Sequence, residues 1–377
     1  VLGQAHLPCH ISIILPAHSN YAAAHIITGL KQEQAPHTFS AQNYAELIDC
    51  PISISQSQLA QFSINGIPHR IAITGASARL DLTRISQDMQ TICATQQKFW
   101  GNSPFSDYTF LIHASADGYG GLEHKNSTAL ICKQQDLPKL GESNTKSHDY
   151  IKFLGLVSHE YFHAWNVKTL KPIGFVDYDL SQAIDSSELW FYEGFTAYYD
   201  DLMLLRSGVI NIEMYLDLLA GSLTQVRRAK GEEIQTLAAA GMEAWTKYYR
   251  ADENAINSLI SYYTKGAALA LCIDLSLRLE SAASVSLDHL MRNLWAVFQT
   301  GQGIPKKQLE ATFCVSPSLS ALLEQGLHRT TPLPVSALLE QMGIQTQWRA
   351  AQSAQDNGGW IHNPSERIDI GARYSAQ

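Results

Sequence analysis

The first part of the chain alternates between apolar and polar positions, as β-strands do. His10–Leu15 follows this period of two, and the segments Gln61–Ile64 and Ile67–Ile73 flank the dipeptide Asn65-Gly66. Asn-Gly between two such segments is the strongest short signal for a β-hairpin, because both residues tolerate the positive φ angles of a two-residue turn. The pattern therefore predicts a β region over the first 80 residues.

The apolar positions change to a helical period at Asp81. Between Leu82 and Ile92 they recur every three or four residues, which indicates one face of a helix that ends before Gly101. Two apolar strands, Tyr108–His113 and Thr128–Cys132, are expected next, separated by a glycine-rich turn. A polar loop then leads to a region in which nearly every segment has a helical period.

The helices expected after Asp149 lie near residues 150–167, 187–206, 211–228, 256–281, 287–299 and 318–325. Asp149 is a candidate N-cap of the first of these helices. Strands followed by helices predict an α+β fold. We divide the chain into a β domain (1–80), a mainly helical domain (81–345) and a segment (346–377) that loses the period. The last segment contains Asn357-Gly358-Gly359 and reads as a linker to a further domain that is cut off at Gln377.

Composition describes a soluble globular protein, large enough for an enzyme, rather than a nucleic-acid or membrane protein. The chain has 377 residues, of which 45% are hydrophobic and 16% charged, enough for two or three domains. Its net charge of -8 repels phosphate backbones and anionic membranes, so neither nucleic acid nor membrane is an expected partner. The longest apolar stretch, near Ala267–Ile273, is far shorter than the roughly 20 residues of a membrane helix.

The chain start and the cysteines add two smaller expectations. Val1 is not Met and no secretory leader follows it, so either a leader was removed or the chain begins inside a longer protein. A cytoplasmic location is expected, and a periplasmic one is the alternative because we expect the N-terminal part of the protein to be missing from this sequence. The six cysteines include no C-x-x-C pair, which indicates core residues rather than ligands or disulfides.

The sequence His159-Glu160-Tyr161-Phe162-His163 is an H-E-x-x-H motif. On a helix, two histidines four residues apart point from one face toward the same cation, and the spacing fits zinc. Glu160 follows the first ligand without binding the metal, where the general base for a zinc-activated water belongs. Pairs of histidines at this spacing also occur on structural helices, so a catalytic site requires a third ligand.

Glu193 is the candidate third ligand. It lies among Trp190, Phe191, Tyr192 and Phe195, which cover most directions around a helix and leave little polar face. A carboxylate is costly there without a cation or hydrogen-bond donors. The alternative is an ordinary solvated helix residue. Two His, one Glu and a water would complete a catalytic zinc site with one Zn²⁺ per chain.

Four segments, in order, resemble the glycyl aminopeptidase family of gluzincin metallopeptidases, bacterial relatives of aminopeptidase N that carry a C-terminal PDZ domain. They are GGLEH (Gly120–His124), HEYFHAWNVK (His159–Lys168), FYEGFTAYYDD (Phe191–Asp201) and ISYYTKGA (Ile260–Ala267). The resemblance implies a β domain remnant followed by a thermolysin-like, mostly helical zinc-peptidase domain. Ile368–Gln377 resembles the entry into the PDZ domain, which implies a fragment at both ends.

The same resemblance implies roles for individual residues. It makes His159, His163 and Glu193 the zinc ligands, Glu160 the base and Tyr263 the donor to the tetrahedral intermediate. From the residues alone, Tyr263 is one of a Tyr-Tyr pair at the start of an apolar helix, where core packing is the commoner role.

The GGLEH segment corresponds to the Gly-x-Met-Glu-Asn segment of aminopeptidase N. By this resemblance Gly120 and Gly121 bind the substrate backbone on an edge strand, and Glu123 binds the free amine of the peptide. Without relatives, Glu123 would read as a solvated turn residue. His124 stands where the relatives have Asn, which changes the surroundings of the amine.

These observations predict a zinc-dependent aminopeptidase that removes a small N-terminal residue, Gly or Ala, from a peptide substrate. A zinc endopeptidase is the alternative within enzymes, and it is favoured if the cleft is open at both ends and Glu123 faces away from the metal. A binding protein with a vestigial zinc site and a PDZ domain that captures C-terminal peptides is the alternative from another class. Retention of Glu160 argues against it.

Overall fold

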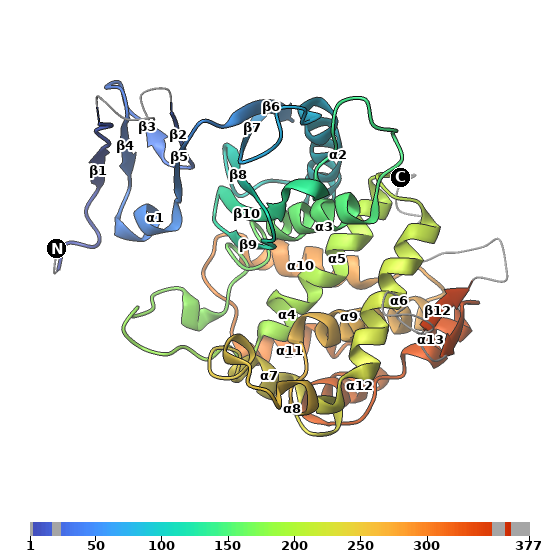
Figure 1. Cartoon of the computed structure of the whole chain (residues 1–377). Coiled ribbons are helices and arrows are strands. Elements are labelled where there is room, and N and C mark those ends of the chain that lie inside the picture. The colour runs from blue at the N-terminus through green and yellow to red at the C-terminus, as the bar shows by residue number, and fades with distance from the viewer. Residues whose placement is uncertain (1–2, 17–23, 349–358, 363–377) are drawn as a thin grey trace. The chain divides into compact units, whose positions relative to one another are not determined.

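The computed structural model describes residues 3–16, 24–348 and 359–362. Two compact units divide the chain, Val1–Ala164 and Trp165–Gln377. Strands gather in the first unit and helices in the second (Figure 1), which confirms the predicted α+β class. The predicted turn at Asn357-Gly358 and the predicted PDZ entry from Ile368 lie outside the described residues.

Two small antiparallel sheets begin the first unit. One has the strand order β1-β4-β3, and the other pairs β2 with β5. The strands are β1 (Cys9–Ser12), β2 (His25–Thr28), β3 (Lys31–Gln32), β4 (Thr38–Ala41) and β5 (Ile52–Ser55). Helix α1 (Tyr44–Asp49) begins at Asn43, whose side chain accepts a hydrogen bond from the backbone of Glu46. Buried side chains of Leu30 and Phe39 contribute to a small core.

A five-stranded mixed sheet with the order β6-β7-β8-β10-β9 follows in the same unit. Its strands are β6 (Gln58–Ile64), β7 (Ile67–Thr74), β8 (Tyr108–Ser115), β9 (Gly120–Glu123) and β10 (Ser127–Lys133). Strands β7, β8 and β10 are parallel, while β6 and β9 form antiparallel edges. Asn65 and Gly66 have φ angles of 52° and 82°, which confirms the hairpin. The sheet contains strands on both sides of the domain boundary predicted at residue 80.

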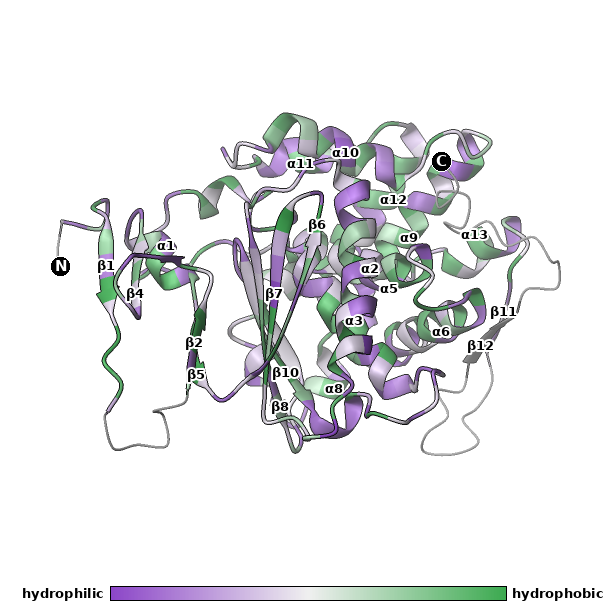
Figure 2. Ribbon diagram, turned by 90° about the horizontal axis from the view of Figure 1, so that it is seen from above, coloured by the Kyte–Doolittle hydropathy of each residue, from purple (hydrophilic) through white to green (hydrophobic). Residues whose placement is uncertain are grey.

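Two long helices pack on this sheet (Figure 2), α2 (Leu82–Trp100) and α3 (His148–Phe162). The predicted apolar face of α2 is confirmed, since Ile85, Met89 and Ile92 are fully buried. The predicted N-cap of α3, Asp149, is wrong: Ser147 caps the helix and accepts from the backbone N–H of Tyr150. Asp149 lies in the first turn, where a negative charge also interacts favourably with the helix dipole.

The second unit is built from helices around α9 (Tyr262–Glu280), whose segment from Ala268 to Leu275 is buried. The other helices are α4 (Leu189–Tyr192), α5 (Gly194–Arg206), α6 (Ile212–Arg228), α7 (Leu237–Met242), α8 (Ala255–Ser258), α10 (Leu287–Phe298), α11 (Lys306–Phe313), α12 (Pro317–His328) and α13 (Val335–Gln341). Short 3-10 turns cover Ile173–Phe175, Lys230–Glu233 and Tyr248–Arg250. Helix α9 contacts α4, α5, α6, α7, α10, α12 and α13.

Two predicted helices are interrupted. The segment near 187–206 is divided into α4 and α5 at Glu193, and the segment near 256–281 is divided into α8 and α9. Strands β11 (Gln345–Trp348) and β12 (Gly359–His362) pair antiparallel, and all their residues except Gln345 fall in the range predicted as a linker. Within the described ranges, no helix is long and apolar enough to cross a membrane.

Candidate metal centre

His159 and His163 occupy the end of α3. His159 belongs to its last turn, and His163 follows as the C-cap with helical φ and ψ angles of -61° and -20°. One ring nitrogen of each histidine lies within 4.8 Å of the other, and the ring centroids are 4.6 Å apart. His163 is buried. The structure therefore brings the two predicted histidines close enough to share a single cation.

Two carboxylates accompany His163 in the same unit. Ligand atoms of Glu123, Glu160 and His163 all lie within 4.8 Å of one another. Glu160 is buried on α3, and Glu123 ends the edge strand β9, half-buried. A cluster of carboxylates and an imidazole is electrostatically stable when a cation or protons offset the negative charge. The predicted base and the predicted amine-binding residue are thus neighbours.

Gly121 on β9 provides the space that the Glu160 side chain fills. A Cβ atom added to Gly121 would overlap the Oε1 and Cδ atoms of Glu160. The glycine was predicted to admit the substrate backbone. In the structure, the missing side chain of Gly121 leaves the space in which the Glu160 carboxylate lies.

Buried hydrogen bonds connect α3 to its neighbours α2 and β7. The Tyr161 hydroxyl lies 2.8 Å from Nε2 of His69 and 2.9 Å from Nε2 of Gln97. His69 is fully buried, and burial lowers its pKa to about 4. One helical turn earlier, Nε2 of Gln96 donates to the carbonyl oxygen and the hydroxyl of Ser158. The contacts attach α3 to α2 and β7.

Residues in the N-terminal part of the same unit form hydrogen bonds with the turn after β9. The Asp49 carboxylate accepts from the backbone N–H of Lys125 at 2.8 Å and lies 3.5 Å from Nδ1 of His124. The Asn126 side chain donates to the carbonyl oxygen of Gly29 at 2.9 Å. His124, which replaces the Asn of the relatives' motif, therefore supports the turn next to Glu123.

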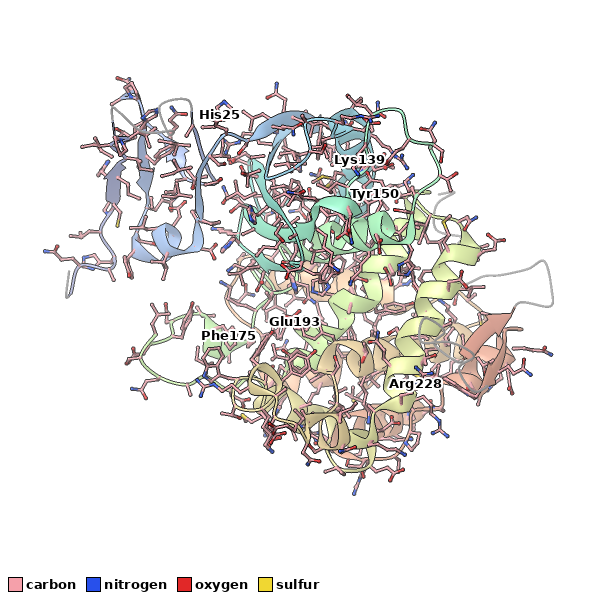
Figure 3. The ribbon with its side chains drawn as sticks, in the orientation of Figure 1. His25, Lys139, Tyr150, Phe175, Glu193 and Arg228 are labelled. Carbon is pink, nitrogen blue, oxygen red and sulfur yellow. The ribbon has the colours of Figure 1, made fainter. Side chains whose placement is uncertain are left out.

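Glu193 lies in the second unit, at the junction between α4 and α5 (Figure 3). Trp190, Phe191, Tyr192 and Phe195 are all buried around it, while Glu193 itself is half-buried. The apolar surroundings predicted from the sequence are therefore confirmed. The break in the helix at this residue was not predicted.

Asn166 and Thr196 stabilise this junction. The Asn166 amide donates to the carbonyl oxygens of Phe191 and Tyr192 at 3.3 and 3.5 Å, and to the Thr196 hydroxyl at 3.2 Å. The Thr196 hydroxyl donates to the Tyr192 carbonyl at 2.7 Å. These bonds satisfy carbonyl groups at the end of α4. They fix the backbone on both sides of Glu193.

Tyr263 lies in the first turn of α9 and interacts electrostatically with Glu193. Burial raises the pKa of the Tyr263 phenol far above its usual range, and the negative charge of Glu193 raises it further. The phenol therefore keeps its proton and can donate a hydrogen bond. Its hydroxyl lies 3.2 Å from the Tyr249 hydroxyl.

The residues in these surroundings that were not predicted include Asp49, His69, Asn166 and Tyr249. Asn166 falls inside the HEYFHAWNVK segment, so that motif contained a signal for it. The other three are distant in the sequence from the predicted residues that they contact, and no motif surrounds them.

Solved structures of low sequence identity share the fold of this chain. The M1 zinc metallopeptidase of Deinococcus radiodurans has a TM-score of 0.53 and 14% identity, over 83% of this chain and 63% of that one. Native yeast LTA4 hydrolase has a TM-score of 0.55 and 14% identity, over 89% and 49% of the two chains. The chain therefore has the fold of M1-type zinc metallopeptidases.

The family follows from two sequence matches. The model of the M61 glycyl aminopeptidase family matches residues 152–269, and that of the M61 N-terminal domain matches residues 1–56. An aminopeptidase N family protein from Idiomarina loihiensis is 37% identical with a TM-score of 0.90, over 94% of this chain and 61% of that one. The predicted resemblance to the glycyl aminopeptidase family is confirmed, and the matches support a zinc metallopeptidase.

The chain spans less than two thirds of the length of these solved relatives. Among curated proteins, none matches it.

Proposed function

We propose that this protein is a zinc-dependent aminopeptidase that hydrolyses the first peptide bond of peptides with a small N-terminal residue, Gly or Ala. The observation that carries the proposal is the grouping of Glu160 and Glu123 with His163 at the end of α3. A base such as Glu160 beside a metal ligand is expected in any metallopeptidase. A second carboxylate on an edge strand, such as Glu123, can in addition bind the free amine of a peptide. The family name supports a small first residue, and the tripeptide Tyr-Ser-Ala bound to a mutant Deinococcus relative supports a peptide as the substrate.

The chemistry of the donor set fits one zinc ion per chain. Zinc binds imidazole nitrogen and carboxylate oxygen, and two His with one Glu is the ligand set of a catalytic site. His159 and His163 supply the imidazoles, and Glu193 is our candidate for the carboxylate. Its support is its place in the family motif and its apolar surroundings, where a carboxylate is stable only with a cation or donors. When bound, zinc polarises the scissile carbonyl and makes water more acidic.

Protein side chains carry the proton and stabilise charge. Glu160 takes a proton from the attacking water and passes it to the leaving amine, as a general base and then a general acid. Gly121 leaves the space in which that carboxylate is held. Tyr263, whose phenol keeps its proton, donates a hydrogen bond to the oxyanion of the tetrahedral intermediate.

Recognition of the substrate is assigned to β9. Its edge position allows a peptide to align along Gly120 and Gly121 as an added strand. Glu123 then pairs with the ammonium group, which sets the distance from the peptide's end to the scissile bond. The turn fastened by Asp49 keeps Glu123 in place.

We also propose that the domains follow the predicted order, with part of a β domain first, then the catalytic domain, then a linker to a PDZ domain. The two matched ranges, 1–56 and 152–269, support the first two parts. Strands β6 and β7 belong to the sheet that carries β9, so the catalytic domain includes them.

The test measures metal content and hydrolysis on one preparation of the protein. We expect one zinc per chain, cleavage of Gly and Ala arylamides, loss of activity on chelation and recovery with added zinc. Acetylated substrates should be cleaved slowly. Full activity in metal-free protein would refute the metal mechanism, and equal cleavage of acetylated and free peptides would indicate an endopeptidase. Stoichiometric zinc without hydrolysis of any peptide would favour the non-catalytic alternative.

A further inference from the structure

One surface tyrosine reaches the phenol of Tyr263. The hydroxyl oxygen of Tyr249 lies 3.2 Å from that of Tyr263 and 3.3 Å from that of Tyr262. The Tyr249 side chain is 60% exposed, yet its backbone N–H donates to the carbonyl of Ala244 at 3.0 Å. The phenol is therefore held beside two tyrosines although it faces solvent.

Either hydroxyl of the Tyr249–Tyr263 pair could be the donor, and the neighbouring Tyr262 makes one order of donors available. Tyr262 donates its hydroxyl hydrogen to Tyr249. A phenol has one hydrogen to donate, so Tyr249, which accepts from Tyr262, can donate its own to Tyr263. In this order Tyr263 accepts from Tyr249 and donates to an acceptor elsewhere. A chain of this kind polarises each following hydroxyl and makes the last one a stronger donor.

Packing of the aromatic rings holds the hydroxyl groups of Tyr249, Tyr262 and Tyr263 close together. The rings of Tyr262 and Tyr263 stack with centroids 4.7 Å apart, and the Tyr248 ring lies 5.0 Å from that of Tyr262. The Tyr248 hydroxyl faces Oγ of Ser261 at 3.5 Å. Tyr248 therefore shares the aromatic packing with Tyr249, while its hydroxyl has a different neighbour, so the two contributions can be separated by experiment.

We propose that Tyr249 is a positioning residue for Tyr263: it donates to the Tyr263 hydroxyl and so orients that hydrogen toward the oxyanion of the transition state. The proposal rests on the proposed function, since it requires Tyr263 to act as the oxyanion donor. Tyr249 itself does not contact the reacting atoms. Its effect should therefore appear in kcat and only through Tyr263.

The experiment is a double-mutant cycle on Gly or Ala arylamide hydrolysis with the intact chain. Tyr263→Phe should lower kcat about 100-fold or more, as expected for loss of an oxyanion donor. Tyr249→Phe should lower kcat about 3- to 10-fold, the net effect of one neutral hydrogen bond, with KM unchanged. In the Tyr263→Phe background, Tyr249→Phe should have no further effect. Tyr248→Phe is the matched control and should keep the parent kcat.

The outcomes separate this inference from the proposed function. If Tyr263→Phe lowers kcat but Tyr249→Phe does not, or raises it, the orientation proposed for Tyr249 is wrong and the role of Tyr263 stands. Additive losses in the double variant, or a rise in KM alone, would make Tyr249 a substrate contact and overturn the positioning role. An unchanged kcat in Tyr263→Phe would refute the catalytic role of Tyr263, and the inference with it.

Discussion

Acid should destabilise the first unit through His69, which contacts Tyr161 on α3, the helix that carries the two candidate histidine ligands. Nδ1 of the buried ring lies 3.0 Å from the carbonyl oxygen of Ile67, and Nε2 lies 2.8 Å from the Tyr161 hydroxyl. Because the Gln97 amide donates to that hydroxyl, Tyr161 can donate to Nε2 and the neutral ring can donate to Ile67. A second proton on the ring would disrupt this arrangement. Burial accordingly lowers the pKa of His69 from 6.5 to about 4.

The sign and size of the effect follow from linkage. The unfolded chain takes up this proton at a higher pH than the folded chain does, so the stability contribution is present above pH 6.5 and is lost as the pH falls toward 4. With ~1.4 kcal/mol for each pKa unit, His69 alone should reduce the free energy of unfolding by about 2 kcal/mol between pH 7.5 and pH 5. Such a change is a large part of the stability of an ordinary domain.

Urea unfolding at pH 7.5, 6 and 5, followed by tryptophan fluorescence, measures this loss. His69→Gln removes the titrating group and keeps an amide that can bond to Tyr161, so its stability should depend less on pH than that of the parent by about 2 kcal/mol over this range. His113→Gln changes an exposed histidine on β8 of the same sheet and is the matched control. Parallel pH profiles for the parent and His69→Gln would show that His69 is not protonated on unfolding and would refute the reasoning.

Four further predictions concern the proposed site. Glu160→Gln should retain zinc but lose at least about 100-fold in kcat, since it removes the base and no ligand; normal turnover would indicate another base. Glu193→Gln should weaken zinc binding by more than the roughly 10- to 100-fold typical of an outer-shell partner, measured by chelator competition; parent-like affinity would place the third ligand elsewhere. Gly121→Ala should displace the Glu160 carboxylate and lower kcat by up to about 100-fold with zinc retained; an unchanged kcat would mean that the carboxylate has another position. Glu123→Ala should lose about 10- to 150-fold in kcat/KM on free-amine substrates and little on acetylated ones; equal losses on both would give Glu123 a purely structural role.

The elements that could be predicted are those in which neighbours in the sequence determine the conformation. Asn65-Gly66 specifies its hairpin because both residues adopt positive φ angles. His159 and His163 are paired by helical spacing alone. The cap of α3 was missed because Ser147 and Asp149 both suit a helix start, and the choice depends on backbone angles that the sequence does not show.

Contacts between distant segments explain the remaining differences. The apolar pattern continues through Glu193, so nothing in the pattern separates α4 from α5. The break becomes understandable only with Asn166 in place, because its amide bonds to the carbonyl oxygens just before Glu193. Tyr249 was missed for the same reason: its link to Tyr263 joins a short surface turn to α9, and no local motif precedes it.

Two glycines in the predicted motifs, Gly194 and Gly266, lie where two helices cross. A Cβ atom on Gly194 would lie 2.5 Å from Cα of Gly266, and one on Gly266 would lie 2.7 Å from Cα of Gly194, so α5 and α9 cross with their backbones in contact. Glu193 directly precedes the first glycine, and Tyr263 lies one helical turn before the second. The crossing therefore brings the backbone segments that carry the carboxylate and the phenol close together. The effect of Glu193 on the pKa of Tyr263 is a consequence of that crossing, and a larger residue at either glycine would separate the candidate ligand from the candidate oxyanion donor.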